Sequence, residues 1–159
     1  MPFIAAASKV DLPFKIDQQA VKQQAHDLFS ANFPQTDRLI FAFDNTEIIT
    51  RNFCKPLSYY AEPNTFEERN NDYLENALNY SVEAIEDCVK KAGVNKEDIT
   101  DILFVSTTGL ATPSVDALII NKMHLHPNIN RTPIWGGGMG RCWPWFQERE
   151  CFRKRMARG

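Results

Sequence analysis

Three hydroxyl side chains and a glycine follow directly on an apolar run, and they form the chain's main candidate for a ligand site. Residues 99–106 (ITDILFVS) are rich in Ile, Leu, Phe and Val, which predicts a buried, parallel β-strand. Ser106, Thr107, Thr108 and Gly109 end that strand. Open α/β sheets bind ligands at the carboxyl ends of their strands, so these residues can line a site. A polar strand end that caps the next helix explains them equally well, and both interpretations stay open.

The histidines and cysteines give no comparable signal. His26 falls on an expected helix surface, and His124 and His126 fall in a loop without a third ligand, so no metal site is predicted. Cys54 and Cys88 have the character of small core residues. The four cysteines form no Cys-x-x-Cys pair, which indicates neither a zinc site nor a disulfide framework and favours a reducing, cytoplasmic setting.

The elements that must position these residues alternate between helix and strand. We expect strands over residues 3–7, 48–53, 99–106 and 129–135, and helices over residues 17–30, 36–43, 65–93 and 113–123. Asp17 is expected to cap the first helix, and Thr36 or Asp37 the second. Thr65 and Glu68 have the spacing of a capping box before the long amphipathic helix. This order predicts a layered α/β architecture.

Composition and charge divide the chain near residue 136. The 159 residues are 43% hydrophobic, which supports a packed core, and no run approaches the length of about 18 apolar residues that spans a membrane. The net charge of −2 gives no indication of a nucleic-acid partner, but residues 137–159 carry +4 and the preceding residues −6. Residues 137–159 place aromatic side chains among arginines, a composition that is also found on nucleic-acid-binding surfaces. Without periodicity or a fold to hold this tail, we predict that it is disordered.

Several motifs in order resemble the type III polyketide synthases, the chalcone/stilbene synthase family of the thiolase superfamily, and its bacterial branch most of all. They are Asp37-Arg-Leu39, Phe53-x-Lys55-Pro56, Phe66-Glu-Glu-Arg-Asn70-x-x-Tyr73, Ala92-Gly93, the run ILFVSTTGLATP over residues 102–113, and Pro133-Ile-Trp-Gly136. The resemblance covers roughly residues 3–136, and it implies the N-terminal half of a thiolase-like layered αβαβα fold, left incomplete. Residues 137–159 would be a non-homologous basic tail.

The resemblance also implies a chemistry. Family members are homodimeric acyltransferases that use CoA thioesters and no bound cofactor. A cysteine takes a starter acyl group from acyl-CoA, and a histidine and an asparagine from the second half promote decarboxylation of malonyl-CoA, whose carbanion extends the chain. A helix N-terminus and an imidazolium stabilise such a thiolate.

By resemblance, four residues match positions that have a known role in the family. Thr107 and Thr108 match positions that line the acyl and polyketide pocket. Thr112 matches a position that reaches across the dimer into the partner copy's cavity, and Arg38 is similar to a basic residue near the CoA entrance. The chain departs from the family pattern at the nucleophile's position, where Met139 stands in place of the cysteine.

These observations lead to two function hypotheses. The chain derives from an acyltransferase of polyketide biosynthesis but is inactive as written, because the nucleophilic cysteine and the second half are missing; a reading-frame slip near residue 137 would account for this, and divergence into a short protein is the other explanation. Alternatively, the chain is a non-catalytic interaction protein that pairs with a full-length synthase or binds acyl-CoA. We expect no nucleic-acid partner and no membrane span.

Overall fold

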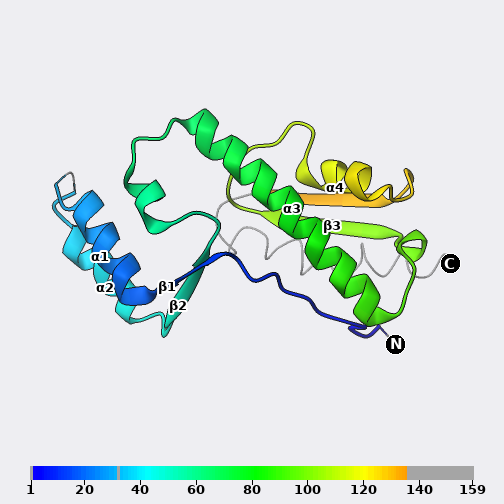
Figure 1. Cartoon of the computed structure of the whole chain (residues 1–159), viewed down its shortest axis with the longest axis horizontal. Coiled ribbons are helices and arrows are strands. Elements are labelled where there is room, and N and C mark those ends of the chain that lie inside the picture. The colour runs from blue at the N-terminus through cyan, green and yellow to red at the C-terminus, as the bar shows by residue number, and fades with distance from the viewer. Residues whose placement is uncertain (1, 32, 136–159) are drawn as a thin grey trace. The chain divides into compact units, whose positions relative to one another are not determined.

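The computed structural model describes residues 2–31 and 33–135, which form two compact units (Figure 1). One unit contains residues 9–69 and the other contains residues 1–8 together with the chain from Asn70 onward. The long helix α3 (Phe66–Ala92) begins in the first unit and lies mostly in the second. Helices and strands alternate along the chain, which confirms the α/β class expected from the sequence.

The unit of residues 9–69 pairs a small antiparallel sheet with a helical hairpin. Strands β1 (Phe14–Asp17) and β2 (Thr50–Phe53) are antiparallel, with Phe14 opposite Phe53. Helices α1 (Gln18–Phe29) and α2 (Thr36–Asp44) lie side by side (Figure 1). A 3₁₀ helix follows at Leu57–Ala61.

A buried glutamine joins the elements of this unit. Gln18 is 3% exposed, and its backbone N–H donates to the Ile49 carbonyl. Its side-chain Nε2 donates to the Phe43 carbonyl at 3.3 Å, while its Oε1 accepts from Arg51 Nε at 2.7 Å. A buried amide must find partners for all its polar atoms, so Gln18 fixes α1 against α2 and β2.

Helix α3 begins and ends as its sequence predicts. The Thr65 backbone N–H donates to a Glu68 carboxylate oxygen at 2.8 Å, and the Glu68 backbone N–H donates back to Thr65 Oγ1 at 3.2 Å, which confirms the capping box. Gly93 ends the helix with φ of +68°, a conformation that a residue without Cβ adopts at little cost. Near this end, the Lys91 ammonium and the Ser8 hydroxyl hold the pKa of Asp87 below its usual range.

The second unit is organised by two parallel strands. Strands β3 (Asp101–Ser106) and β4 (Asn130–Trp135) pair in register from Asp101 opposite Asn130 to Ser106 opposite Trp135. Helix α4 (Val115–Met123) connects them, as a parallel pair requires. This confirms the parallel arrangement expected for residues 99–106.

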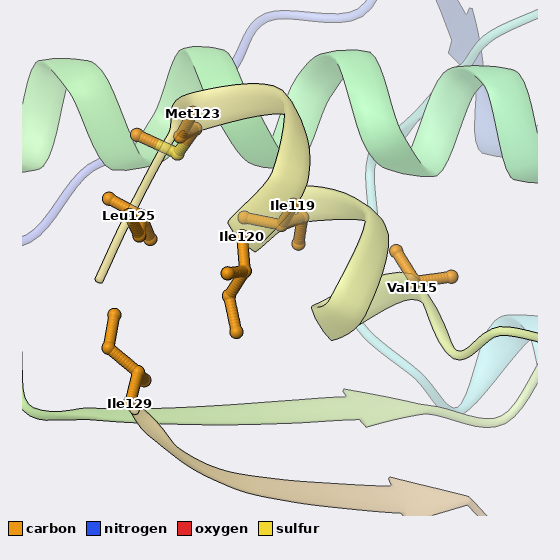
Figure 2. Packing of buried hydrophobic residues seen from close by; sticks show 6 residues of the cluster. All are labelled: Val115, Ile119, Ile120, Met123, Leu125 and Ile129. Carbon is orange, nitrogen blue, oxygen red and sulfur yellow. The ribbon is translucent and has the colours of Figure 1, made fainter. Parts of the chain in front are cut away.

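The core of this unit lies between α4 and the strands (Figure 2). The most buried apolar side chains come from α4 and the segment after it: Val115, Ile119, Ile120, Met123, Leu125 and Ile129. On the strand side, Ile102 and Phe104 pack against them, and one face of α3 from Tyr73 to Ile85 contacts them as well. The core therefore covers one face of the β3–β4 pair.

The opposite face of β3 is open in the described part of the chain. Leu103 is 47% exposed and Val105 is 58% exposed. The expectation of a buried strand is therefore wrong for this face of β3 among the described residues. Alternate side chains of a strand point to opposite faces, and α3 and α4 contact only the face of Ile102 and Phe104.

Two local expectations are also wrong. Residues 3–7 form no strand, and Phe3 and Ile4 are exposed, because strand residues need a paired neighbour and none of the described strands pairs with this segment. Helix α2 is capped by neither Thr36 nor Asp37. Its cap residue is Gln35, which makes no capping hydrogen bond, while the Thr36 hydroxyl donates back to the Phe33 carbonyl at 2.6 Å.

Because the core covers one face of β3 only, shortening a side chain on the core side should destabilise the protein more than shortening one on the open face. Ile119 is 1% exposed, so Ile119→Ala should lower the free energy of unfolding by about 2–5 kcal/mol through lost contacts and a cavity. The control Leu103→Ala, on the open face, should cost less than about 1 kcal/mol. Urea unfolding followed by circular dichroism measures both, and equal losses would contradict the one-sided core.

Candidate acyl-pocket loop

The segment between β3 and α4, residues 107–114, carries three of the predicted site residues, and we call it the threonine loop. Thr107, Thr108 and Thr112 all have exposed side chains. The loop leaves the carboxyl end of β3, which pairs in parallel with β4. The structure therefore brings these three residues onto one loop at the strand end where α/β folds bind ligands. The Thr112–Pro113 peptide bond is cis.

The middle of the threonine loop is tied to α3 by one asparagine. The Leu110 backbone N–H donates to Asn70 Oδ1 at 2.7 Å, and Asn70 Nδ2 donates to the Leu110 carbonyl at 2.9 Å. A single carboxamide thus satisfies both backbone groups of one loop residue, as a neighbouring strand would.

A tyrosine one turn further along α3 holds the start of the loop. The Tyr73 hydroxyl is hydrogen-bonded to Ser106 Oγ, and the same Ser106 oxygen accepts from the Thr108 backbone N–H at 3.3 Å. Gly109 makes this approach possible. A Cβ there would lie 2.7 Å from Asn70 Oδ1 and 2.9 Å from Tyr73 Cε1, which is too close.

A buried carboxylate fastens the other end of the loop. Asp116 lies in the first turn of α4 and is fully buried, in a position where the helix dipole favours a negative charge. Its Oδ2 lies 3.4 Å from Nη1 of Arg131 on β4, a long contact. Its Oδ1 has no hydrogen-bond partner among the residues that the structure describes. The pair links the first turn of α4, just after the threonine loop, to β4.

The remaining predicted site residues lie elsewhere. Arg38 is exposed on α2, within the unit of residues 9–69. Met139 lies outside the described residues. Among residues 2–31 and 33–135, no group of three or more His, Cys, Asp or Glu side chains could hold a metal ion.

The two described cysteines are half-buried free thiols. Burial raises the pKa of the Cys54 thiol, which lowers its thiolate fraction and its reactivity near neutral pH. His26 contacts Asp37 at 3.2 Å on the surface of α1, and His124 ends α4 with a positive φ. No described helix is long and apolar enough to cross a membrane.

Sequence reasoning singled out the hydroxyl residues but missed the side chains that hold them. Asn70 and Leu110 are forty residues apart, and no local pattern pairs them. One signal was present, since Asn70 stands on the same helical face as Tyr73, Leu74 and Ala77, where an apolar residue is expected. A polar residue on such a face indicates a hydrogen-bond partner in a neighbouring segment.

Comparisons with known proteins agree with this geometry. The sequence model of "Chalcone and stilbene synthases, N-terminal domain" matches residues 43–142. A Bacillus subtilis protein provisionally named a chalcone synthase is 34% identical over 143 residues, which cover 87% of this chain and 39% of that protein. The 1,3,6,8-tetrahydroxynaphthalene synthase of Streptomyces griseus is 32% identical over 65% of this chain and 28% of its own length.

The solved structures with the same fold are type III polyketide synthases. The 1,3,6,8-tetrahydroxynaphthalene synthase of Streptomyces coelicolor superposes with a TM-score of 0.71 at 24% identity, over 91% of this chain and 43% of that one. CsyB complexed with CoA-SH superposes with a TM-score of 0.68 at 19% identity, over 82% of this chain and 36% of that one. The fold is thus the α/β fold of these thiolase-like synthases.

This chain belongs to the chalcone/stilbene synthase family, the type III polyketide synthases. It spans about two fifths of the length of the Bacillus subtilis relative. The family match includes the threonine loop and its partners Asn70 and Tyr73.

Crowding at Gly109 yields a prediction for the loop. In Gly109→Ala the new Cβ forces Tyr73 and Asn70 to move, which should cost about 1–3 kcal/mol and speed exchange of the Leu110 amide. Amide hydrogen exchange measured by NMR reports both effects. The control Gly93→Ala meets nothing within 4 Å; its positive φ strains the end of α3, but Leu110 exchange should stay unchanged. Unchanged Leu110 exchange in Gly109→Ala would contradict the packing described for the loop.

Proposed function

We propose that this chain is the N-terminal part of a polyketide-forming acyltransferase and that, as written, it does not complete the reaction. The reaction transfers a starter acyl group from a CoA thioester and extends it with carbon from malonyl-CoA. The observation that carries the proposal is the threonine loop, held by α3 at the carboxyl end of β3 in a chain of this family.

In this proposal Thr107 and Thr108 line the acyl pocket. Both are exposed and follow Ser106, so their hydroxyls are free of the core and available to a ligand. Thr112 faces the cavity of a partner copy in a homodimer, and its exposure supports that role. Arg38 provides a positive charge for the CoA phosphates, supported by its exposure on α2.

The absence of turnover rests on the residue at position 139. In acyl transfer a cysteine thiolate forms a bond to the acyl carbon while the CoA thiolate leaves, and the protein keeps the acyl group as a thioester. The thioether of Met139 has no proton to lose and cannot form this thioester. The family match runs through residue 142, which supports comparing residue 139 with the family's nucleophile. Cys142 stands three residues later in the sequence.

Acylation tests the inactivity directly. After incubation with decanoyl-CoA, intact-mass spectrometry should show no stoichiometric, hydroxylamine-sensitive acyl adduct, because the position compared with the family's nucleophile holds the thioether of Met139. With malonyl-CoA added, CoA release should equal that of a heat-killed sample.

A full-length type III synthase serves as the positive control for both readouts. The variant Cys142→Ala decides whether Cys142 has replaced the nucleophile. A stoichiometric, hydroxylamine-sensitive adduct that disappears in Cys142→Ala would overturn the proposed inactivity.

One observation favours a second function, a non-catalytic partner of a full-length synthase. Leu103 and Val105 expose apolar surface on the open face of β3, and Ile134 lies opposite Val105 in the register. Contiguous apolar surface of this kind is typical of protein–protein contact sites.

Co-expression distinguishes this second function from the first. A tagged copy of this chain should retain a full-length type III synthase on an affinity column if the open face is a contact site. The double variant Leu103→Lys/Val105→Lys places two charges on that face and should abolish retention, while Lys15→Ala on β1 serves as an exposed control. Retention that survives the double variant would exclude this face as the contact.

A further inference from the structure

One side chain outside the threonine loop holds its middle. The loop's ends are fixed by β3 and by the buried start of α4, where Val115 is 3% exposed. Its middle is held through Leu110, whose backbone N–H and carbonyl both pair with Asn70. Leu110 stands two residues from Thr108 and two from Thr112, so a movement at Leu110 changes the position of both threonines.

Only an asparagine meets the chemistry of this contact. Leu110 offers one donor and one acceptor, and the carboxamide supplies the complementary pair within one planar group. Aspartate at pH 7 has two acceptors and would repel the Leu110 carbonyl, while alanine offers neither group. Glutamine is one methylene longer, and the Asn70 oxygen already lies close to Gly109, 2.7 Å from where a Cβ of that residue would be.

We propose that Asn70 is a positioning residue for the acyl pocket, setting how the threonine loop presents Thr107, Thr108 and Thr112 to the acyl chain. The inference rests on the proposed function, in which these threonines line the pocket. Asn70 itself touches the loop backbone rather than the ligand. Small displacements of pocket groups are costly to recognition, so a single pair of hydrogen bonds at Leu110 is enough to change affinity.

Amide exchange and ligand affinity, measured on the same variants, test this role. In Asn70→Ala the Leu110 amide should exchange about tenfold faster, since it loses one partner and its carbonyl loses the other. Affinity for dodecyl-CoA, a thioether that cannot transfer its chain, should fall by a similar factor in calorimetry. Asn76→Ala is the matched control, because Asn76 lies on the same helix and its side chain donates within that helix, to the Asp72 carbonyl.

The variant Asn70→Asp makes the protection of the Leu110 amide depend on pH, an effect that loss of packing alone would not produce. Its neutral acid can accept from the Leu110 N–H and donate to the Leu110 carbonyl, whereas its carboxylate cannot donate. Leu110 protection relative to wild type should therefore be low at pH 7 and recover as the pH falls toward the ordinary aspartate pKa of about 3.9. The threonine loop carries no titratable side chain, and the charged residues next to Asn70 on α3 include Arg69, directly before it, and Glu67, one turn earlier.

The outcomes separate this inference from the proposed function. Dodecyl-CoA that binds wild type and Asn70→Ala equally would overturn the positioning role while leaving the pocket in place. Unchanged Leu110 exchange in Asn70→Ala, or no recovery in Asn70→Asp at low pH, would overturn it as well. A wild-type chain that binds no dodecyl-CoA would contradict the proposed function and the inference together.

Discussion

Burial of α4 between α3 and the parallel strand pair is the constraint on which the second unit depends. Val115, Ile119 and Ile120 are among the most buried side chains of the chain, and Ile102 and Phe104 meet them from β3. Because β3 and β4 run parallel, the chain between them must cross the sheet face, and α4 makes that crossing. The threonine loop is the part of this connection that precedes α4, so the packing of β3 and α4 in the core fixes where the loop begins and ends.

The same core explains both the candidate site and the open surface. Packing on one face of β3 directs Ser106 toward α3, where Tyr73 binds it, and leaves Leu103 and Val105 exposed on the other face. The first consequence positions hydroxyl residues at a strand end. The second gives the chain an apolar surface suited to a further layer or a partner. The candidate site and the exposed apolar surface therefore both follow from packing on one face of β3.

Local signals in the sequence predicted local structure well. The Thr65–Glu68 capping box, the Asp17 cap of α1 and the Gly93 helix end depend on contacts within a few residues, and all three are confirmed. The parallel strands followed from apolar runs separated by a helix. Pairing over long separations was not predictable, which is why residues 3–7 were wrongly expected as a strand and the Asn70–Leu110 contact was missed. The motifs identified the family because they preserve order along the chain, whereas the pocket residues remain proposals.

We propose that the threonine loop forms the wall of an acyl pocket and that Met139 stands where the family has its nucleophile. Photoaffinity labelling with an acyl-CoA analogue that carries a diazirine at the end of its chain tests this most directly, followed by peptide mapping. The account predicts that labelling concentrates on the peptide containing Thr107, Thr108 and Thr112 and that excess dodecyl-CoA suppresses it. Labelling that avoids residues 107–112, or that excess dodecyl-CoA does not suppress, would contradict the account.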